Sequence, residues 1–114
     1  MEKENIILTK TLDFACDIQD LEDKLIDRKK FVLANQVAKS GSSIGANVRE
    51  AQRAVSKADF INKLGIALKE ADETSYWFDI IDRKVFKVDD KLRTEIKEII
   101  SLLVTIINSS KKNK

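Results

Sequence analysis

The sequence predicts an all-α protein: an antiparallel up-down-up-down four-helix bundle, formed as one domain over residues 1–114. The chain has no proline and only three glycines, so almost nothing interrupts a helix. Apolar residues recur three, four and seven positions apart in four long stretches, which is the pattern of amphipathic helices. Only short, charged segments separate these stretches, and short connections favour antiparallel neighbours.

The first two helices are expected at about residues 5–27 and 33–54. The apolar stripe of the first helix consists of Ile7, Phe14, Ile18, Leu21 and Leu25. A charged turn, Arg28-Lys29-Lys30, follows it, and no glycine marks its position. Helix boundaries at this turn are therefore set by the apolar pattern alone.

The last two helices are expected at about residues 57–83 and 90–109. Ser56 followed by Asp59 is typical of a helix start, because a serine side chain can accept a backbone N–H of the first turn. Asp89 or Asp90 can cap the fourth helix in the same way. The inward stripe of the third helix is Phe60, Leu64, Ala67, Ala71, Thr74 and Phe78, and that of the fourth is Leu92, Ile96, Ile99, Leu103 and Ile106.

The stretch Gln36–Arg53 forms regular stripes only if it is helical. One stripe is polar, and the stripe beside it is apolar or small and includes Gly41 and Gly45. Two small residues four apart on one face let another backbone approach closely. The alternative is that residues 40–45 form a Gly/Ser loop. We favour the helix because the apolar register continues through both glycines. A phosphate-binding loop is discarded, because this segment lacks the Gly-Lys-Ser/Thr ending of such loops.

Polar residues of the second and third helices are expected to meet in an inter-helix layer. Ser and Asn have low helix propensity, so a run of them needs partners on a neighbouring helix. The expected layer comprises Gln36, Ser40, Ser43, Asn47, Glu50, Glu70, Glu73 and Thr74. Its structural interpretation is a network that fixes helix register. The alternative is a site in which Glu50, Glu70 and Glu73 act as acids, bases or cation ligands.

Composition excludes several classes of site. Histidine is absent, which removes Ser-His-Asp and Cys-His catalysis and the usual zinc ligands. The single cysteine, Cys16, cannot form an internal disulfide and is expected to be a small buried or half-buried core residue. We expect no cofactor and no metal.

The N-terminus has no signal-peptide pattern, and no segment reaches the length of a membrane span. The expected location is therefore the cytoplasm, without membrane association.

In an up-down bundle the first and third connections lie at the same end. Arg28, Lys29 and Lys30 are then expected near Arg83, Lys84 and Lys87, which would make one end basic. Lys39, Arg49 and Arg53 lie on the outer side of the second helix and complete the candidate nucleic-acid-binding set. Net charge is only +2, so nucleic-acid binding would depend on a local patch. Ile61, Leu68 and Tyr76, on the outer part of the third helix, are the candidate subunit interface.

Two segments resemble a known family. The first is Gln36-Val37-Ala38-Lys39-Ser40-Gly41, continued by Ser43-Ile44-Gly45-Ala46-Asn47-Val48 and Glu50-Ala51. The second runs from Asp59-Phe60 through Ile66-Ala67-Leu68-Lys69-Glu70-Ala71 to Tyr76-Trp77-Phe78. Together they are similar to the four-helix-bundle proteins encoded in intervening sequences of bacterial 23S ribosomal RNA genes.

The resemblance implies an up-down bundle that assembles into a homo-oligomer, usually a pentamer, with no established enzymatic activity. The chain is also similar to the accessory protein of diversity-generating retroelements, a basic pentamer thought to hold nucleic acid. Acidic residues nearly balance basic ones here, 19 against 21, which is a departure from that protein. The expected function is a non-enzymatic oligomeric bundle that binds structured RNA or DNA; the alternative is a protein-binding scaffold.

Overall fold

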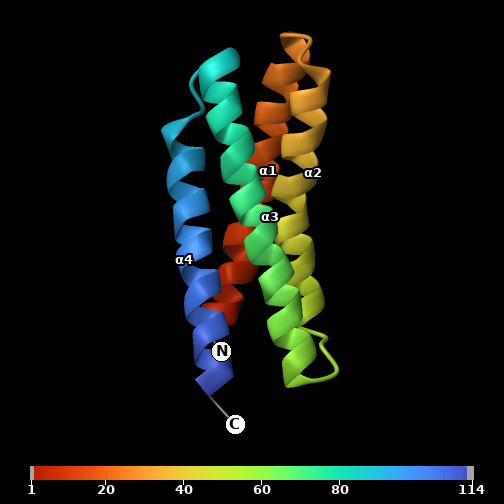
Figure 1. The fold of residues 1–114 in the computed structure, drawn as a ribbon, viewed down its shortest axis with the longest axis vertical. Helices are drawn as coiled ribbons and strands as arrows, with labels where there is room; N and C mark the ends of the chain where they lie inside the picture. Colours follow the sequence, from red (N-terminus) through yellow and green to blue (C-terminus); the bar gives the residue numbers. More distant parts are fainter. Residues whose placement is uncertain (1, 113–114) are drawn as a thin grey trace.

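The computed structural model describes residues 2–112, and describes side chains from Ile6 onward. It confirms the all-α class: the described chain is four helices without a strand (Figure 1). They are α1 (Glu2–Asp27), α2 (Phe31–Ala51), α3 (Lys57–Lys84) and α4 (Asp90–Lys112). The bundle measures 49 × 22 × 19 Å.

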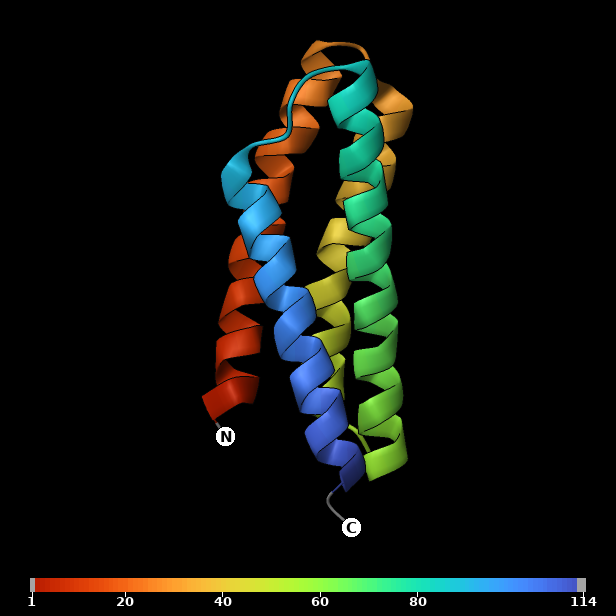
Figure 2. The ribbon, with the colours of Figure 1, turned by 60° about the vertical axis from the view of Figure 1, so that its left-hand side comes forward.

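The helices run up, down, up and down, as predicted. The α1–α2 and α3–α4 connections lie at one end, and the α2–α3 connection lies at the other end with both termini (Figures 1 and 2). Each helix contacts its two neighbours in the order α1, α2, α3, α4, and α4 closes the ring on α1. α2 packs more extensively against α1 and α3 than α4 does.

The end of α1 is formed by a left-handed residue that is not glycine. Lys29 has φ 60°, Lys30 N donates to Leu25 O at 2.9 Å, and Lys29 N donates to Ile26 O at 2.8 Å. This pair of bonds is the Schellman arrangement, which usually places glycine where Lys29 lies. It turns the chain sharply enough for α2 to begin at Phe31.

Side-chain caps begin α3 and α4, as the sequence indicated. Ser56 Oγ accepts Asp59 N at 3.0 Å, and Asp59 Oδ2 accepts Val55 N at 3.2 Å. Asp89 Oδ1 accepts Lys91 N at 3.0 Å. Each bond satisfies a backbone donor near a helix start that has no partner within the helix.

Residues 40–45 are helical, so the loop alternative is wrong. α2 nevertheless ends at Ala51 rather than near residue 54. The next three N–H groups bond three residues back instead of four: Gln52 to Arg49, Arg53 to Glu50, and Ala54 to Ala51, at 3.0–3.2 Å. The chain tightens there into turns of 3₁₀ type, which commonly finish a helix.

The two glycines of α2 face α1. A Cβ built on Gly41 would lie 2.9 Å from Ile18 Cγ1, and one on Gly45 would lie 3.2 Å from Thr11 Cβ and 3.4 Å from its carbonyl carbon. The close approach predicted from their spacing is therefore the α1–α2 contact. Cys16 is exposed, and its expected place in the core is wrong. It lies two positions from Phe14 and from Ile18, both buried, and two positions is more than half a helical turn.

Candidate nucleic-acid interface

The structure brings together the six cations expected at one end. Arg28, Lys29 and Lys30 form the α1–α2 turn, Arg83 and Lys84 end α3, and Lys87 follows in the α3–α4 connection. The two connections touch, because the Arg28 guanidinium carbon lies 5.5 Å from the centroid of the Phe86 ring. We call this set of six residues the basic end.

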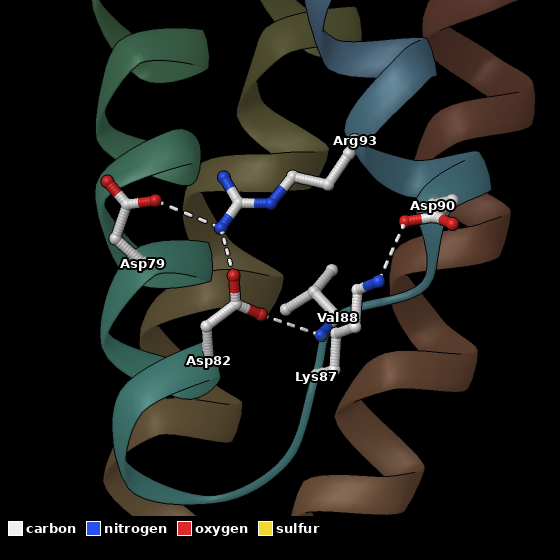
Figure 3. A network of polar contacts seen from close by, with 6 residues as sticks. All are labelled: Asp79, Asp82, Lys87, Val88, Asp90 and Arg93. Atoms are coloured by element: carbon white, nitrogen blue, oxygen red, sulfur yellow. Dashed lines mark hydrogen bonds and ion pairs between the residues drawn. The ribbon is translucent and has the colours of Figure 1, made fainter.

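Two acidic side chains of α3 near the basic end, Asp79 and Asp82, are bound within the fold. In Figure 3, Arg93 Nη2 donates to Asp79 Oδ1 at 2.9 Å and to Asp82 Oδ2 at 2.5 Å. Asp82 Oδ1 accepts Val88 N at 2.7 Å. The Val88 N–H and, less strongly, Arg93 hold the pKa of the Asp82 carboxyl below its ordinary value. Asp82 therefore ties the α3–α4 connection to both helices and stays ionised.

Five cations of the basic end have no acidic partner in the described part of the chain. Lys87 Nζ lies 3.6 Å from Asp90 Oδ1. None of the other five, Arg28, Lys29, Lys30, Arg83 and Lys84, lies within 4.0 Å of a carboxylate among residues 6–112, and all five are exposed. Their charges remain available to a ligand.

A pocket of about 470 Å³ lies beside the basic end, between α1 and the α3–α4 connection. Its charged lining consists of four cations, Lys24, Arg28, Lys87 and Lys91, and three carboxylates, Asp17, Asp20 and Asp89. Lys24 and Lys91 were not among the residues predicted from the sequence. Each lies four positions in sequence from a predicted cation, Lys24 from Arg28 and Lys91 from Lys87, and this spacing was the signal that could have identified them.

The remaining predicted cations lie elsewhere. Arg49 is in the last turn of α2 and Arg53 follows it, so both lie at the opposite end of the bundle (Figure 1). Lys39 is exposed near the middle of α2. The structure therefore divides the predicted nucleic-acid set into one cluster and three separate residues.

The predicted polar layer is reduced to one buried contact between helices. The hydroxyls of Ser40 and Thr74 are hydrogen-bonded at 2.9 Å, and both residues are buried. Thr74 Oγ1 also bonds the Glu70 carbonyl oxygen at 2.8 Å. This contact links α2 to α3.

Other members of the predicted layer bond within their own helix or near the surface. Ser43 Oγ donates to Lys39 O at 2.7 Å, and Asn47 Nδ2 donates to Ser43 O at 2.8 Å. Glu73 accepts from Trp77 Nε1 at 3.3 Å. Gln36 and Glu70 are half-buried.

One buried polar residue was not predicted from the sequence. Thr11 of α1 is buried, and its hydroxyl bonds Ile7 O at 2.7 Å. The bond satisfies the hydroxyl within α1, so Thr11 can face the close approach of α2 at Gly45 without a partner on that helix.

The three glutamates of the alternative site do not form a metal centre. Glu50 pairs with Lys63 at 3.0 Å, a contact that raises the pKa of Lys63 through its hydrogen bond and charge. Within the described residues, no group of three or more Asp, Glu or Cys side chains could hold a metal ion. None of the described helices is long and apolar enough to cross a membrane.

The candidate interface residues differ in exposure. Tyr76 is 60% exposed and contacts Trp77 edge-on, with ring centroids 5.5 Å apart. Ile61 and Leu68 are half-buried and pack against the core. Of the three, Tyr76 offers the most surface to a partner.

A carboxyl pair between α1 and α4 was not foreseen. Burial, and then the neighbouring Asp17 carboxylate, raise the pKa of Glu95 from 4.5 to about 7. Asp17 Oδ2 and Glu95 Oε1 are both withdrawn from solvent. Lys91 Nζ lies 3.2 Å from Asp17 Oδ2, and its positive charge offsets part of the negative charge of the two carboxyl groups.

Comparisons with known proteins agree with this geometry. The chain is 44% identical to a protein of unknown function of the S23 ribosomal protein family from Bacteroides thetaiotaomicron, whose crystal structure superposes with a TM-score of 0.86. The match covers 93% of this chain and 98% of that one. No curated protein matches the chain. The model of the 23S rRNA-intervening sequence protein family matches residues 3–108; the chain therefore belongs to that family.

Proposed function

We propose that this protein is a cytoplasmic, non-enzymatic bundle that binds structured RNA or DNA through its basic end. The observation that carries the proposal is the cluster of five exposed cations without acidic partners among the described residues, from the α1–α2 turn and the end of α3. Nucleic acids present a dense row of phosphates, and Lys and Arg bind them largely by charge.

The local arrangement matters more than net charge. The chain carries only +2 overall, which gives little general attraction to a polyanion. At the basic end, however, Asp82, Asp89 and Asp90 are held by an arginine, by backbone N–H groups or by Lys87. These three acids are thus partly neutralised, while the five cations are not.

The proposal is tested by titrating a labelled RNA hairpin and measuring fluorescence anisotropy at several salt concentrations. Arg28, Lys29 and Lys30 are changed together to glutamine. The matched control changes Lys39, Arg49 and Arg53 to glutamine, which removes the same charge from α2 and the turn that follows it. We expect the first variant to bind more weakly and its salt slope to fall by roughly 0.7–0.9 per lost phosphate contact.

Two results would count against this function. If the control variant weakened binding as much as the variant of the basic end, the nucleic acid would be attracted by the overall charge of the protein and the basic end would not be a defined interface. If neither RNA nor DNA bound the unchanged protein at low salt, nucleic-acid binding would be abandoned.

We also propose that the protein is a homo-oligomer, with a pentamer favoured by its family. A ring would repeat the basic end and raise the effective concentration of each site for a long strand. Light scattering on a sizing column should then give about five times the subunit mass of 13.0 kDa. A mass of one subunit at micromolar concentration would remove the oligomer from the proposal.

The second candidate is a protein-binding scaffold, and the exposed ring of Tyr76 favours it. Aromatic residues are enriched at protein interfaces. A partner held there should still bind after the Arg28, Lys29 and Lys30 charges are removed, and should be lost in Tyr76→Ser. If binding were lost on removing these charges and kept in Tyr76→Ser, the result would favour nucleic-acid binding through the basic end.

A further inference from the structure

We infer that the pocket beside the basic end receives one unpaired nucleotide of a bound nucleic-acid strand. The inference rests on the proposed function and adds a substrate class to it: strands with an accessible, unstacked base rather than a continuous duplex. The pocket combines a suitable volume, a planar aromatic and guanidinium pair, and cations at one site.

The size and lining suit a nucleotide. The volume of about 470 Å³ is within the ordinary range of small-molecule sites, roughly 300–1,000 Å³. The buried side chains of Leu21 and Leu92 contribute apolar surface, and Phe86 adds an aromatic ring. A base is planar and mostly apolar on its faces, so it gains from leaving water in such a site.

The stacking partners are Phe86 and Arg28. The guanidinium carbon of Arg28 lies 5.5 Å from the centroid of the Phe86 ring, and both residues line the pocket. Unpaired bases of RNA typically stack on aromatic rings and on arginine planes. The end of α1 and the α3–α4 segment thus bring a guanidinium and an aromatic ring together at one pocket.

Charged groups in the same pocket match the other parts of a nucleotide. Lys24 is an exposed cation of the lining without an ion-pair partner among the described residues and can bind a phosphate, whereas Lys91 Nζ is paired with Asp17 Oδ2 at 3.2 Å. Asp20 is an exposed carboxylate of the lining, which can accept hydrogen bonds from amino or imino groups on a base edge. A paired base in a duplex has these groups engaged and its faces stacked, so it cannot enter the pocket.

The test compares a labelled single-stranded oligonucleotide with its fully paired duplex by fluorescence anisotropy. Phe86→Leu keeps an apolar side chain but removes the ring. Phe31→Leu is the matched control, because Phe31 is also an aromatic residue at this end, 60% exposed, and does not line the pocket. We expect Phe86→Leu to weaken single-strand binding by at least about fivefold, with duplex binding unchanged and Phe31→Leu without effect.

A second variant covers the case in which Phe86→Leu does not fold. Lys24→Ala removes an exposed cation of the pocket, and Lys69→Ala removes one from the surface of α3. Only Lys24→Ala should weaken the single strand more than the duplex.

The outcomes separate the inference from the proposed function. Equal binding of strand and duplex, or an unchanged strand affinity in Phe86→Leu and Lys24→Ala, overturns the pocket inference while leaving the basic end intact. No binding of either nucleic acid at low salt overturns both. If a nucleoside monophosphate displaces the strand at micromolar concentration, the pocket is a free-nucleotide site and the inference about strands is wrong.

Discussion

At the scale of single residues, Gly41 shows how the space around a glycine decides whether replacing it by alanine raises or lowers the free energy of unfolding. The added Cβ of Gly41→Ala would meet Ile18 Cγ1 at 2.9 Å and Cγ2 at 3.1 Å. Ile18 is buried and branched, so it cannot move away easily. We expect Gly41→Ala to lower the free energy of unfolding by about 1–3 kcal/mol, measured by urea denaturation.

Gly65 is the matched control for this prediction. It lies within α3, and a Cβ added there would have nothing within 4 Å. Gly65→Ala should therefore raise the free energy of unfolding by about 0.5–1 kcal/mol through helix propensity alone. If both substitutions shifted stability in the same direction, the close α1–α2 approach would be contradicted.

At Lys29 we expect glycine to be the more stable residue, because the backbone conformation there favours glycine. At φ 60° an L side chain is strained by about 1 kcal/mol. Lys29→Gly should raise the free energy of unfolding by a similar amount, measured in the same denaturation experiment. Lys29→Ala keeps a Cβ and should bring no gain; an equal gain would show that charge, not conformation, is responsible.

At the scale of elements, Asp82 holds the α3–α4 connection. Its carboxylate accepts Val88 N and pairs with Arg93, whereas Asp79 contacts Arg93 and is 68% exposed at its side chain. Asp82→Asn should lower the free energy of unfolding at pH 7 by about 1–2 kcal/mol. Asp79→Asn, the control, should lower it less.

The Asp82 effect has a definite pH dependence. Because the pKa of Asp82 is lowered in the folded state, its contribution is present above the unfolded value of about 3.9 and is lost as pH falls through the folded value. Denaturation curves of Asp82→Asn and the unchanged protein should therefore converge as the pH falls below the unfolded value and Asp82 becomes protonated in the folded state. A difference that stays constant as the pH falls through this range would contradict the ionised Asp82 clamp.

Helix positions could be predicted from the sequence better than contacts between helices. The caps at Ser56 and Asp89 follow from local chemistry and require no knowledge of the fold. The polar layer was mostly wrong in its partners, because Ser43 and Asn47 satisfy themselves on their own helix. A stripe on a helix shows which residues share a face; it does not show how far the facing helix is rotated.

At the scale of the whole molecule, Glu95 makes folding stability depend on pH near neutrality. The pKa of Glu95 is raised from 4.5 to about 7 in the folded state. The folded state therefore binds more protons than the unfolded one between these values, and the free energy of unfolding falls as pH rises through this window. The groups that face Glu95 are Asp17 and Asp13 on α1 and Lys91 on its own helix.

Glu95→Gln should remove most of this dependence. We expect it to raise the free energy of unfolding at pH 8 by about 1 kcal/mol, allowing for solvent screening, and to have little effect at pH 4.5. Thermal melts across pH 4.5–8 measure this. Glu98→Gln, an exposed neighbour paired with Lys10 at 3.2 Å, should leave the slope in place; a flat profile in the unchanged protein would refute the prediction.

The four helices, their up-down order and the basic end follow from the amino-acid sequence alone. Helical period, the absence of proline and short connections are local properties, and up-down topology then fixes which connections share an end. That Ser40 meets Thr74, that Asp17 lies against Glu95 and that Arg28 covers Phe86 became known only from the folded chain. These contacts depend on the rotation and separation of whole helices, which packing of the complete core sets.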